Sequence, residues 1–375
     1  MLLNYTGESS SPQSHSLGQF AHNYPQHQFT VAGMHAKFLL ISSLLAVAVP
    51  PRALEEELLF SPEASTKMTI AYSMEASMDL VDQSVDITVD GEDRSPELPP
   101  TEVNVEQVGS ITFTDQVLEQ EDGNVTKLRR TFVEIVDENS QTVESDGGGG
   151  SETTEGESDL EGMTVVFTWD AEESEYGVEF DEDEDGDEEL LEGLEFDIYM
   201  TGFLPDGGVS IGDSWEVEPG AMSWVVDPGG DLSIVSERDS EDDDERSQQI
   251  KDNLEGTINC TLKEVVEEDG ARLAVIEMNI EITTGFILEE DIDMEQVSGT
   301  SEEGVAIEYE LAGEYRWNLD AGVLQGFDVS GDISYTMTRT ADVMQGETSI
   351  QQEMLQSFEG TRSMSAEVTF GDSDE

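Results

Sequence analysis

Hydrophobic residues occupy every second position of this chain over unusually long stretches. Between Met68 and Leu80 they fill each even position, with Thr, Ser, Glu and Asp mostly between them. The same order returns on odd positions from Val305 to Leu319, where Gly313 fills one gap. Successive side chains of a strand point to opposite faces, whereas a helix repeats every 3.6 residues. The pattern therefore predicts strands with one apolar and one acidic face, and fifteen such residues would extend roughly 50 Å.

Turn sequences separate these alternating runs. Residues 121–124, 268–270 and 320–322 each combine Asp and Gly between two runs, which predicts three hairpins. The alternation slips by one residue between Val275 and Ile276, which predicts a β-bulge near Val275. The expected fold is all-β and mainly antiparallel: a large curved sheet or half-barrel meander with long strands, one short helix and acidic loop insertions. Whether the sheet closes stays open.

Polar stretches interrupt the alternation. Flexible acidic loops are predicted at 137–162, 236–247 and 286–304, because these segments offer little apolar surface to bury. The short helix is expected from Asp187 to about Tyr199, where Leu190, Leu191, Leu194 and Ile198 share one helical face.

The beginning of the chain predicts export. Lys37 precedes an apolar stretch that ends near Ala46-Val47-Ala48, so residues 34–53 have the features of a secretory signal peptide, with cleavage after Ala48 or Ala53. The upstream residues 1–33 are interpreted as a non-native or disordered extension, and 54–375 as a single β-rich domain. The apolar stretch is shorter than the roughly 20 residues of a membrane-spanning helix. We expect an exported protein of the bacterial periplasm, cell envelope or extracellular space that does not span the membrane.

The charge balance excludes several partners. The chain has 87 Asp and Glu against 15 Lys and Arg, a net charge of −72. Nucleic acids and anionic membranes are bound through Lys and Arg clusters, so neither is an expected partner. Self-repulsion on this scale destabilises a compact fold and is relieved by salt or bound cations. Divalent cations are therefore possible partners.

Catalysis has few candidate residues. All four His residues fall at positions 15, 22, 27 and 35, so the predicted mature chain lacks an imidazole for a nucleophilic triad. No catalytic residue is assigned, and a non-enzymatic role is expected; a hydrolase using paired carboxylates is a remaining alternative. Cys260 is the only cysteine and lies on an apolar run, where a small buried hydrophobic residue is expected.

One segment matches a metal-binding pattern. The spacing D-x-D-x-D-G followed by five residues and Glu resembles the EF-hand calcium loop, whose oxygens at alternate positions surround a hard cation. The resemblance covers twelve residues and implies Ca²⁺ as a possible bound ion; its candidate ligands are Asp181, Asp183, Asp185, Asp187 and Glu192. A solvated acidic loop is the alternative interpretation.

Aromatic and methionine side chains gather on the apolar strand faces. A curved sheet could use them to line a site for an apolar ligand or lipid, although core packing would explain them equally. The candidate face consists of Tyr72, Met74, Met78, Phe167, Trp169, Tyr315, Trp317, Tyr335 and Met337.

Two resemblances accompany these patterns. The segment from Val209 to Val217, with a Gly-Asp turn leading into a strand anchored by Trp215, resembles acidic exported proteins of planctomycete-type bacteria, as do the later strand pairs and the acidic loops. This resemblance spans most of the predicted mature chain and implies no activity. The expected architecture also resembles the half-barrels of periplasmic lipoprotein carriers. The leading hypothesis is a protein that binds an apolar ligand or lipid in the concave face of the sheet; an acidic envelope or surface protein with Ca²⁺-dependent stability is the alternative. An outer-membrane barrel also alternates, but its strands need only about 9 to 11 residues.

Overall fold

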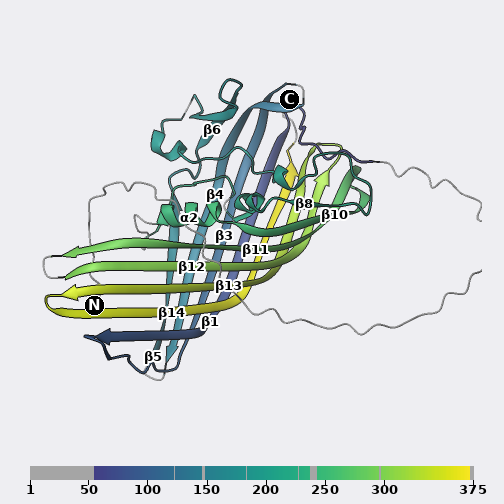
Figure 1. Ribbon diagram of the computed structural model, residues 1–375. Helices are drawn as coiled ribbons and strands as arrows, with labels where there is room; N and C mark the ends of the chain where they lie inside the picture. The colour runs from purple at the N-terminus through teal and green to yellow at the C-terminus, as the bar shows by residue number, and fades with distance from the viewer. Residues whose placement is uncertain are drawn as a thin grey trace, which may run out of the picture. The chain divides into compact units, whose positions relative to one another are not determined.

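Fourteen strands pair into one open, antiparallel sheet (Figure 1). A computed structural model describes residues 55–121, 123–145, 148–182, 184–226, 228–236, 243–294 and 297–371, all within the unit Arg52–Glu375. The predicted extension and signal peptide lie outside these residues. The all-β, mainly antiparallel fold class predicted from the sequence is confirmed.

Most strands are long. In chain order they are β1 (Lys67–Val89), β2 (Glu92–Asp93), β3 (Thr101–Glu121), β4 (Asn124–Ser145), β5 (Gly148–Ser158), β6 (Thr164–Asp170), β7 (Glu175–Phe180), β8 (Ser214–Val217), β9 (Ile234–Ser236), β10 (Glu255–Glu268), β11 (Ala271–Met294), β12 (Val297–Asn318), β13 (Val323–Gln345) and β14 (Thr348–Phe370). They follow the order β7-β6-β4-β3-β1-β14-β13-β12-β11-β10-β8, with β2, β5 and β9 attached at the sides. The first and last long strands, β1 and β14, are therefore neighbours at the centre of the sheet.

The three predicted hairpins are confirmed at β3–β4, β10–β11 and β12–β13. The predicted irregularity also exists, but the extra residue is on the partner strand. Leu262 pairs with Ile276 and Glu264 pairs with Val275, so Lys263 of β10 is the bulged residue. Both faces of β11 are buried around this bulge, which explains the lost alternation there.

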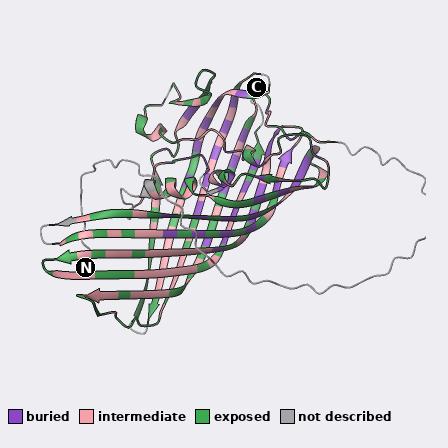
Figure 2. Ribbon diagram, viewed as in Figure 1, coloured by how far each residue is buried: buried purple, intermediate pink, exposed green. Residues whose placement is uncertain are grey.

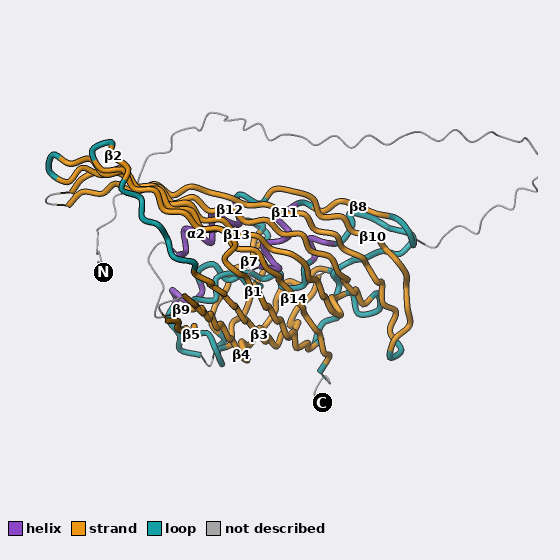
Figure 3. Tube along the Cα trace, turned by 90° about the horizontal axis from the view of Figure 1, so that it is seen from below, coloured by secondary structure: helices purple, strands orange, loops and turns teal. Residues whose placement is uncertain are grey.

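The sheet divides into two arms where β1 leaves β3. Pairing of these strands ends at Asp79 and Asn104, whereas β1 stays paired with β14 as far as Val89. The β11–β14 arm contains residues 82–89, 287–294, 297–304, 338–345 and 348–357, and the β3–β5 arm contains residues 101–103, 137–145 and 148–156. Figure 1 shows the first arm extending to the left and the second downward; Figure 3 shows the first from below, with β2 at its tip.

The prediction of flexible acidic loops is wrong for two of the three segments, because these segments form strands of the two arms. Residues 137–162 contain the end of β4 and all of β5, and residues 286–304 contain the end of β11 and the start of β12. Buried residues concentrate in the undivided part of the sheet from which both arms extend, and the tips are largely exposed (Figure 2). These segments are strands because backbone pairing continues along a neighbour that is already extended, with little apolar burial of their own. Of the third predicted loop, residues 243–247 belong to a helix and 237–242 lie outside the described residues.

Helical elements are short and occur between the strands. They are the 3₁₀ helices η1 (Glu188–Leu191), η2 (Thr201–Phe203) and η3 (Pro219–Met222), and the α-helices α1 (Ser223–Val226) and α2 (Asp243–Asp252). In the part of the chain that the structure describes, no helix has the length and apolar character needed to cross a membrane.

The helix predicted from Asp187 to Tyr199 is wrong. Only η1 forms there, and Gly193 adopts a φ of +76°, a left-handed conformation that ends helical structure. The following residues lie across the apolar face of the sheet and offer their backbone carbonyls to side chains from the strands. We call residues 187–204 the covering segment. A helix would have used those carbonyls internally.

Candidate functional site

A buried ion pair lies beneath the covering segment. Asp115 of β3 and Arg130 of β4 are direct cross-strand partners, and both side chains are fully buried. Arg130 Nε donates to Asp115 Oδ1 at 3.0 Å and Nη2 donates to Oδ2 at 2.9 Å. This two-point geometry is the strongest form of an Arg–carboxylate interaction.

The same guanidinium also binds the covering segment. Arg130 Nη1 donates to the carbonyl of Glu195 at 2.8 Å, and Nη2 to that of Phe196 at 2.9 Å. The rings of Phe113 and Phe167 lie 5.1 and 5.0 Å from the guanidinium carbon, within cation–π range. Every side of this buried cation therefore has a partner.

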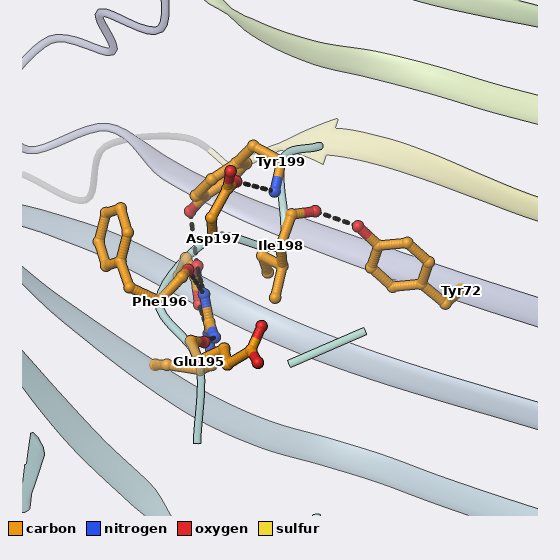
Figure 4. Close-up of polar contacts among 8 residues, drawn as sticks. Tyr72, Glu195, Phe196, Asp197, Ile198 and Tyr199 are labelled. Atoms are coloured by element: carbon orange, nitrogen blue, oxygen red, sulfur yellow. Dashed lines mark hydrogen bonds and ion pairs between the residues drawn. The ribbon is translucent and has the colours of Figure 1, made fainter. Parts of the chain in front are cut away.

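Three tyrosines complete the attachment. Tyr199 donates to Asp115 Oδ2 at 2.5 Å, and Tyr72 donates to the carbonyl of Ile198 (Figure 4). Tyr315 donates to the carbonyls of Tyr199 and Met200 at 3.2 and 3.3 Å. Burial raises the pKa of each of these hydroxyls, so all three remain protonated donors. The network fixes the covering segment to the sheet.

Asp197 supports the same segment from within. Its carboxylate accepts hydrogen bonds from the backbone N–H of Tyr199 at 2.8 Å and from both the backbone and the hydroxyl of Thr201. Burial raises the pKa of Asp197, and these hydrogen bonds together with the charge of Arg130 partly oppose that shift. These roles are structural and require no ligand.

Four residues of the predicted ligand face belong to the covered core. Tyr72, Phe167, Tyr315 and Trp317 are at most 5% exposed. At these positions the core-packing interpretation is correct. Trp169, on the β6–β7 hairpin, is instead 39% exposed and packs edge-on against Tyr176 at 5.1 Å between ring centroids.

The other four predicted residues remain partly exposed on the apolar face. Together with two neighbours they form what we call the open strip: Met74, Met78, Leu80, Tyr335, Met337 and Phe358. Register places them on one face, because Phe358 pairs with both Leu80 and Tyr335. The rings of Tyr335 and Phe358 are 6.2 Å apart. The strip leads from the centre of the sheet towards the β11–β14 arm.

Arg362 lies at the central end of the open strip. It pairs with Ala76 and Gly331 and therefore shares the apolar face, where it is only 9% exposed. Gly331 leaves room for the long side chain, whose guanidinium carbon lies 5.8 Å from the ring centroid of Tyr309. A Cβ at Gly331 would lie 2.1 Å from the Glu310 carbonyl oxygen, so this position also requires glycine for strand packing.

Arg362 has no acidic partner among the described residues. Its Nη2 donates to the sulfur of Met74 at 3.8 Å, and its buried Nε has no hydrogen-bond partner in that part of the chain. A thioether is a weak acceptor. Among the described residues, no carboxylate neutralises the charge of this buried cation.

The predicted calcium ligands are not assembled by the described residues. Asp181 forms an ion pair with Arg129 at 3.1 Å, and Asp187 accepts from the backbone N–H of Glu189 as the N-cap of η1. Asp185 and Glu192 line an acidic hollow of about 570 Å³. No group of three acidic, His or Cys side chains in the described ranges is arranged to hold a metal. Asp183 lies outside those ranges, so the calcium hypothesis stays a prediction.

Cys260 is fully buried, as predicted, and burial raises the pKa of its thiol to about 12. The predicted Gly-Asp turn is also present, since Ser210 N–H donates to Asp213 Oδ2 at 2.9 Å. Trp215 anchors the following strand by donating from its indole to the carbonyl of Phe203 at 3.0 Å.

Comparisons with known proteins give a weak structural match. No protein-family model matches the chain, and no curated protein matches it. Among solved structures the chain is similar to an outer membrane channel from Pseudomonas putida F1, with 8% identity, a TM-score of 0.13, and coverage of 81% of this chain and 97% of that chain. A likeness this weak leaves the function to be inferred from the residues themselves.

Sequence reasoning missed Arg362, Arg130 and Asp115. Each occupies the apolar phase of its strand: Asp115 follows Phe113, Arg130 precedes Phe132, and Arg362 precedes Met364. A charged residue at an apolar position of a long alternating run was the available signal.

Proposed function

We propose that this protein is exported, is not an enzyme, and binds an apolar or amphipathic ligand along the open strip. One observation carries the proposal. The apolar face that is sealed by the covering segment at Tyr72 and Tyr315 continues as partly exposed Met, Tyr and Phe side chains beyond that segment. Exposed contiguous apolar surface is a common mark of ligand-binding or interaction sites in soluble proteins.

The composition of the strip supports this function. Methionine side chains are flexible and polarizable, which suits contact with ligands of variable shape. Met74, Met78 and Met337 line the strip, and Tyr335 and Phe358 add two flat rings. The opposite face of the same strands carries acidic residues, so an apolar ligand has one favourable face.

A neutral fluorescent apolar probe, Nile red, tests the proposal on the full-length chain. We expect saturable binding that is lost in Met337→Glu, because a carboxylate on the strip would have to be desolvated by the probe. Ile287→Glu is the matched control, since Ile287 is 67% exposed on the opposite face of the same arm. Equal loss in both variants, or no saturable binding to the parent chain, would remove the proposal.

A second candidate role, as an acidic envelope or surface component with cation-dependent stability, is favoured by the outer face of the sheet. Glu310 is directly opposite Glu281 on one side and Asp332 on the other. Glu314 is similarly flanked by Glu277 and Asp328. Like charges directly opposite each other destabilise a sheet. A melting temperature that rises in millimolar Ca²⁺ beyond NaCl of matched ionic strength would support this role; equal rises would indicate screening alone.

A further inference from the structure

Arg362 lies at one end of the open strip and indicates which chemical class of ligand the strip could bind. Most charged side chains among the described residues are not buried, and the other buried arginine, Arg130, has a carboxylate partner. Burying a charge is costly unless it is paired and hydrogen-bonded. Arg362 is 9% exposed and contacts a thioether and one aromatic ring. Burying its charge in these surroundings therefore lowers the stability of the fold.

We propose that Arg362 binds the carboxylate of a long-chain monocarboxylic acid whose hydrocarbon chain lies along the open strip. This inference rests on the proposed function and adds the chemical class of the ligand. A guanidinium presents a planar fork of N–H donors that matches a carboxylate in two-point geometry. The buried Nε of Arg362 has no hydrogen-bond partner among the described residues, so the guanidinium keeps an unsatisfied donor.

The geometry of the strip suits one extended chain. Arg362 is six residues along β14 from Gln356, the direct partner of Met337, which corresponds to roughly 20 Å of strand. Between these ends, Gly360 and Phe358 face Met78 and Leu80 of β1, and Ile333 and Tyr335 of β13. Arg362 is thus at one end, apolar side chains follow as far as Tyr335, and the ion-paired Glu303, Arg246 and Arg339 lie near Tyr335 at the other end.

The charge of the whole protein favours a head group with one negative charge. A net charge of −72 repels multiply charged anions at long range. Among the described residues, the side-chain contacts of Arg362 are with Met74 and Tyr309, and neither is a second cation. A monocarboxylate has the smallest charge that can neutralise Arg362.

Matched ligands separate the inference from the proposed function. Oleate and oleyl alcohol have the same chain and differ only in the head group, so their affinities for the full-length protein should differ by about 10- to 100-fold, the range for a charge-assisted hydrogen bond. Arg362→Met should bring oleate to the affinity of the alcohol, and Arg362→Lys should keep part of the preference. Circular dichroism confirms that each variant is folded.

Each outcome has one meaning. A preference for oleate that disappears in Arg362→Met supports the inference. Equal binding of oleate and the alcohol to the parent chain, or an unchanged preference in Arg362→Met, overturns it and leaves the apolar site in place. Failure of both ligands to bind overturns the proposed function as well. Binding of dioleoylphosphatidylglycerol vesicles that depends on Arg362, without binding of oleate, would replace the carboxylate with a phosphate head group and also overturn the inference.

Discussion

Two buried arginines lie on the apolar face of one sheet, and their surroundings are opposite. Arg130 is fully buried and has a two-point carboxylate partner, two backbone carbonyls and two aromatic rings. Arg362 is nearly as buried but contacts a thioether and one ring, with no carboxylate among the described residues. The Arg130 site is complete and holds the covering segment in place. No carboxylate among the described residues pairs with Arg362 in this way, and we propose that a ligand carboxylate does.

The largest expected change in stability follows substitution of Arg130. Arg130→Met should lower the free energy of unfolding by about 3–5 kcal/mol, because Asp115 would remain buried without its cation. Urea denaturation followed by circular dichroism measures the change. Arg316→Met, at a side chain that is 42% exposed, is the control and should change stability by less than about 0.5 kcal/mol. A loss below about 1 kcal/mol for Arg130→Met would contradict the structural role.

Tyrosine-to-phenylalanine variants compare the two arginine sites through a smaller expected change in stability. Tyr199→Phe removes a hydroxyl that donates to Asp115 and should cost about 1.5–3 kcal/mol. Tyr309→Phe keeps the ring over Arg362 and should leave stability within about 0.5 kcal/mol. Similar losses in the same denaturation assay would mean that the two arginines are held in similar ways.

Substitution of Arg362 should change the free energy of unfolding in the direction opposite to substitution of Arg130. Without added ligand, Arg362→Met should raise the free energy of unfolding by about 1 kcal/mol, since methionine keeps much of the packing and removes an unpaired buried charge. Protein refolded from denaturant, and so freed of copurified lipid, is the appropriate sample. Destabilisation by more than about 1 kcal/mol would show that Arg362 is structural, like Arg130.

The smallest effect concerns the acidic outer face. Glu310→Gln removes the middle charge of the row Glu281, Glu310 and Asp332 and should add about 0.2–1 kcal/mol at low salt. The gain should disappear in 1 M NaCl, where the screening length falls to about 3 Å. A gain that persists at high salt would point to a cause other than repulsion.

Periodicity predicted much of this architecture but not the face's division into sealed and open parts. The alternation of Met68–Leu80 and Val305–Leu319 predicted β1 and β12, because successive side chains of a strand point to opposite faces of the sheet. The helix expected at 187–199 failed because its carbonyls bind distant side chains such as Arg130 and Tyr315, which local sequence does not reveal. Of the nine predicted ligand-face residues, those under the covering segment became core for the same reason.

Stability measured with and without oleate tests the central claim most directly. A tenfold difference in affinity corresponds to about 1.4 kcal/mol, more than the advantage expected for Arg362→Met without ligand. At an oleate concentration of about 1,000 times its Kd, the parent protein should gain about 4.1 kcal/mol and become the more stable of the two. We therefore expect Arg362→Met to be the more stable protein without oleate and the parent to be the more stable with it. The same order of stability under both conditions would contradict a carboxylate-binding role for Arg362.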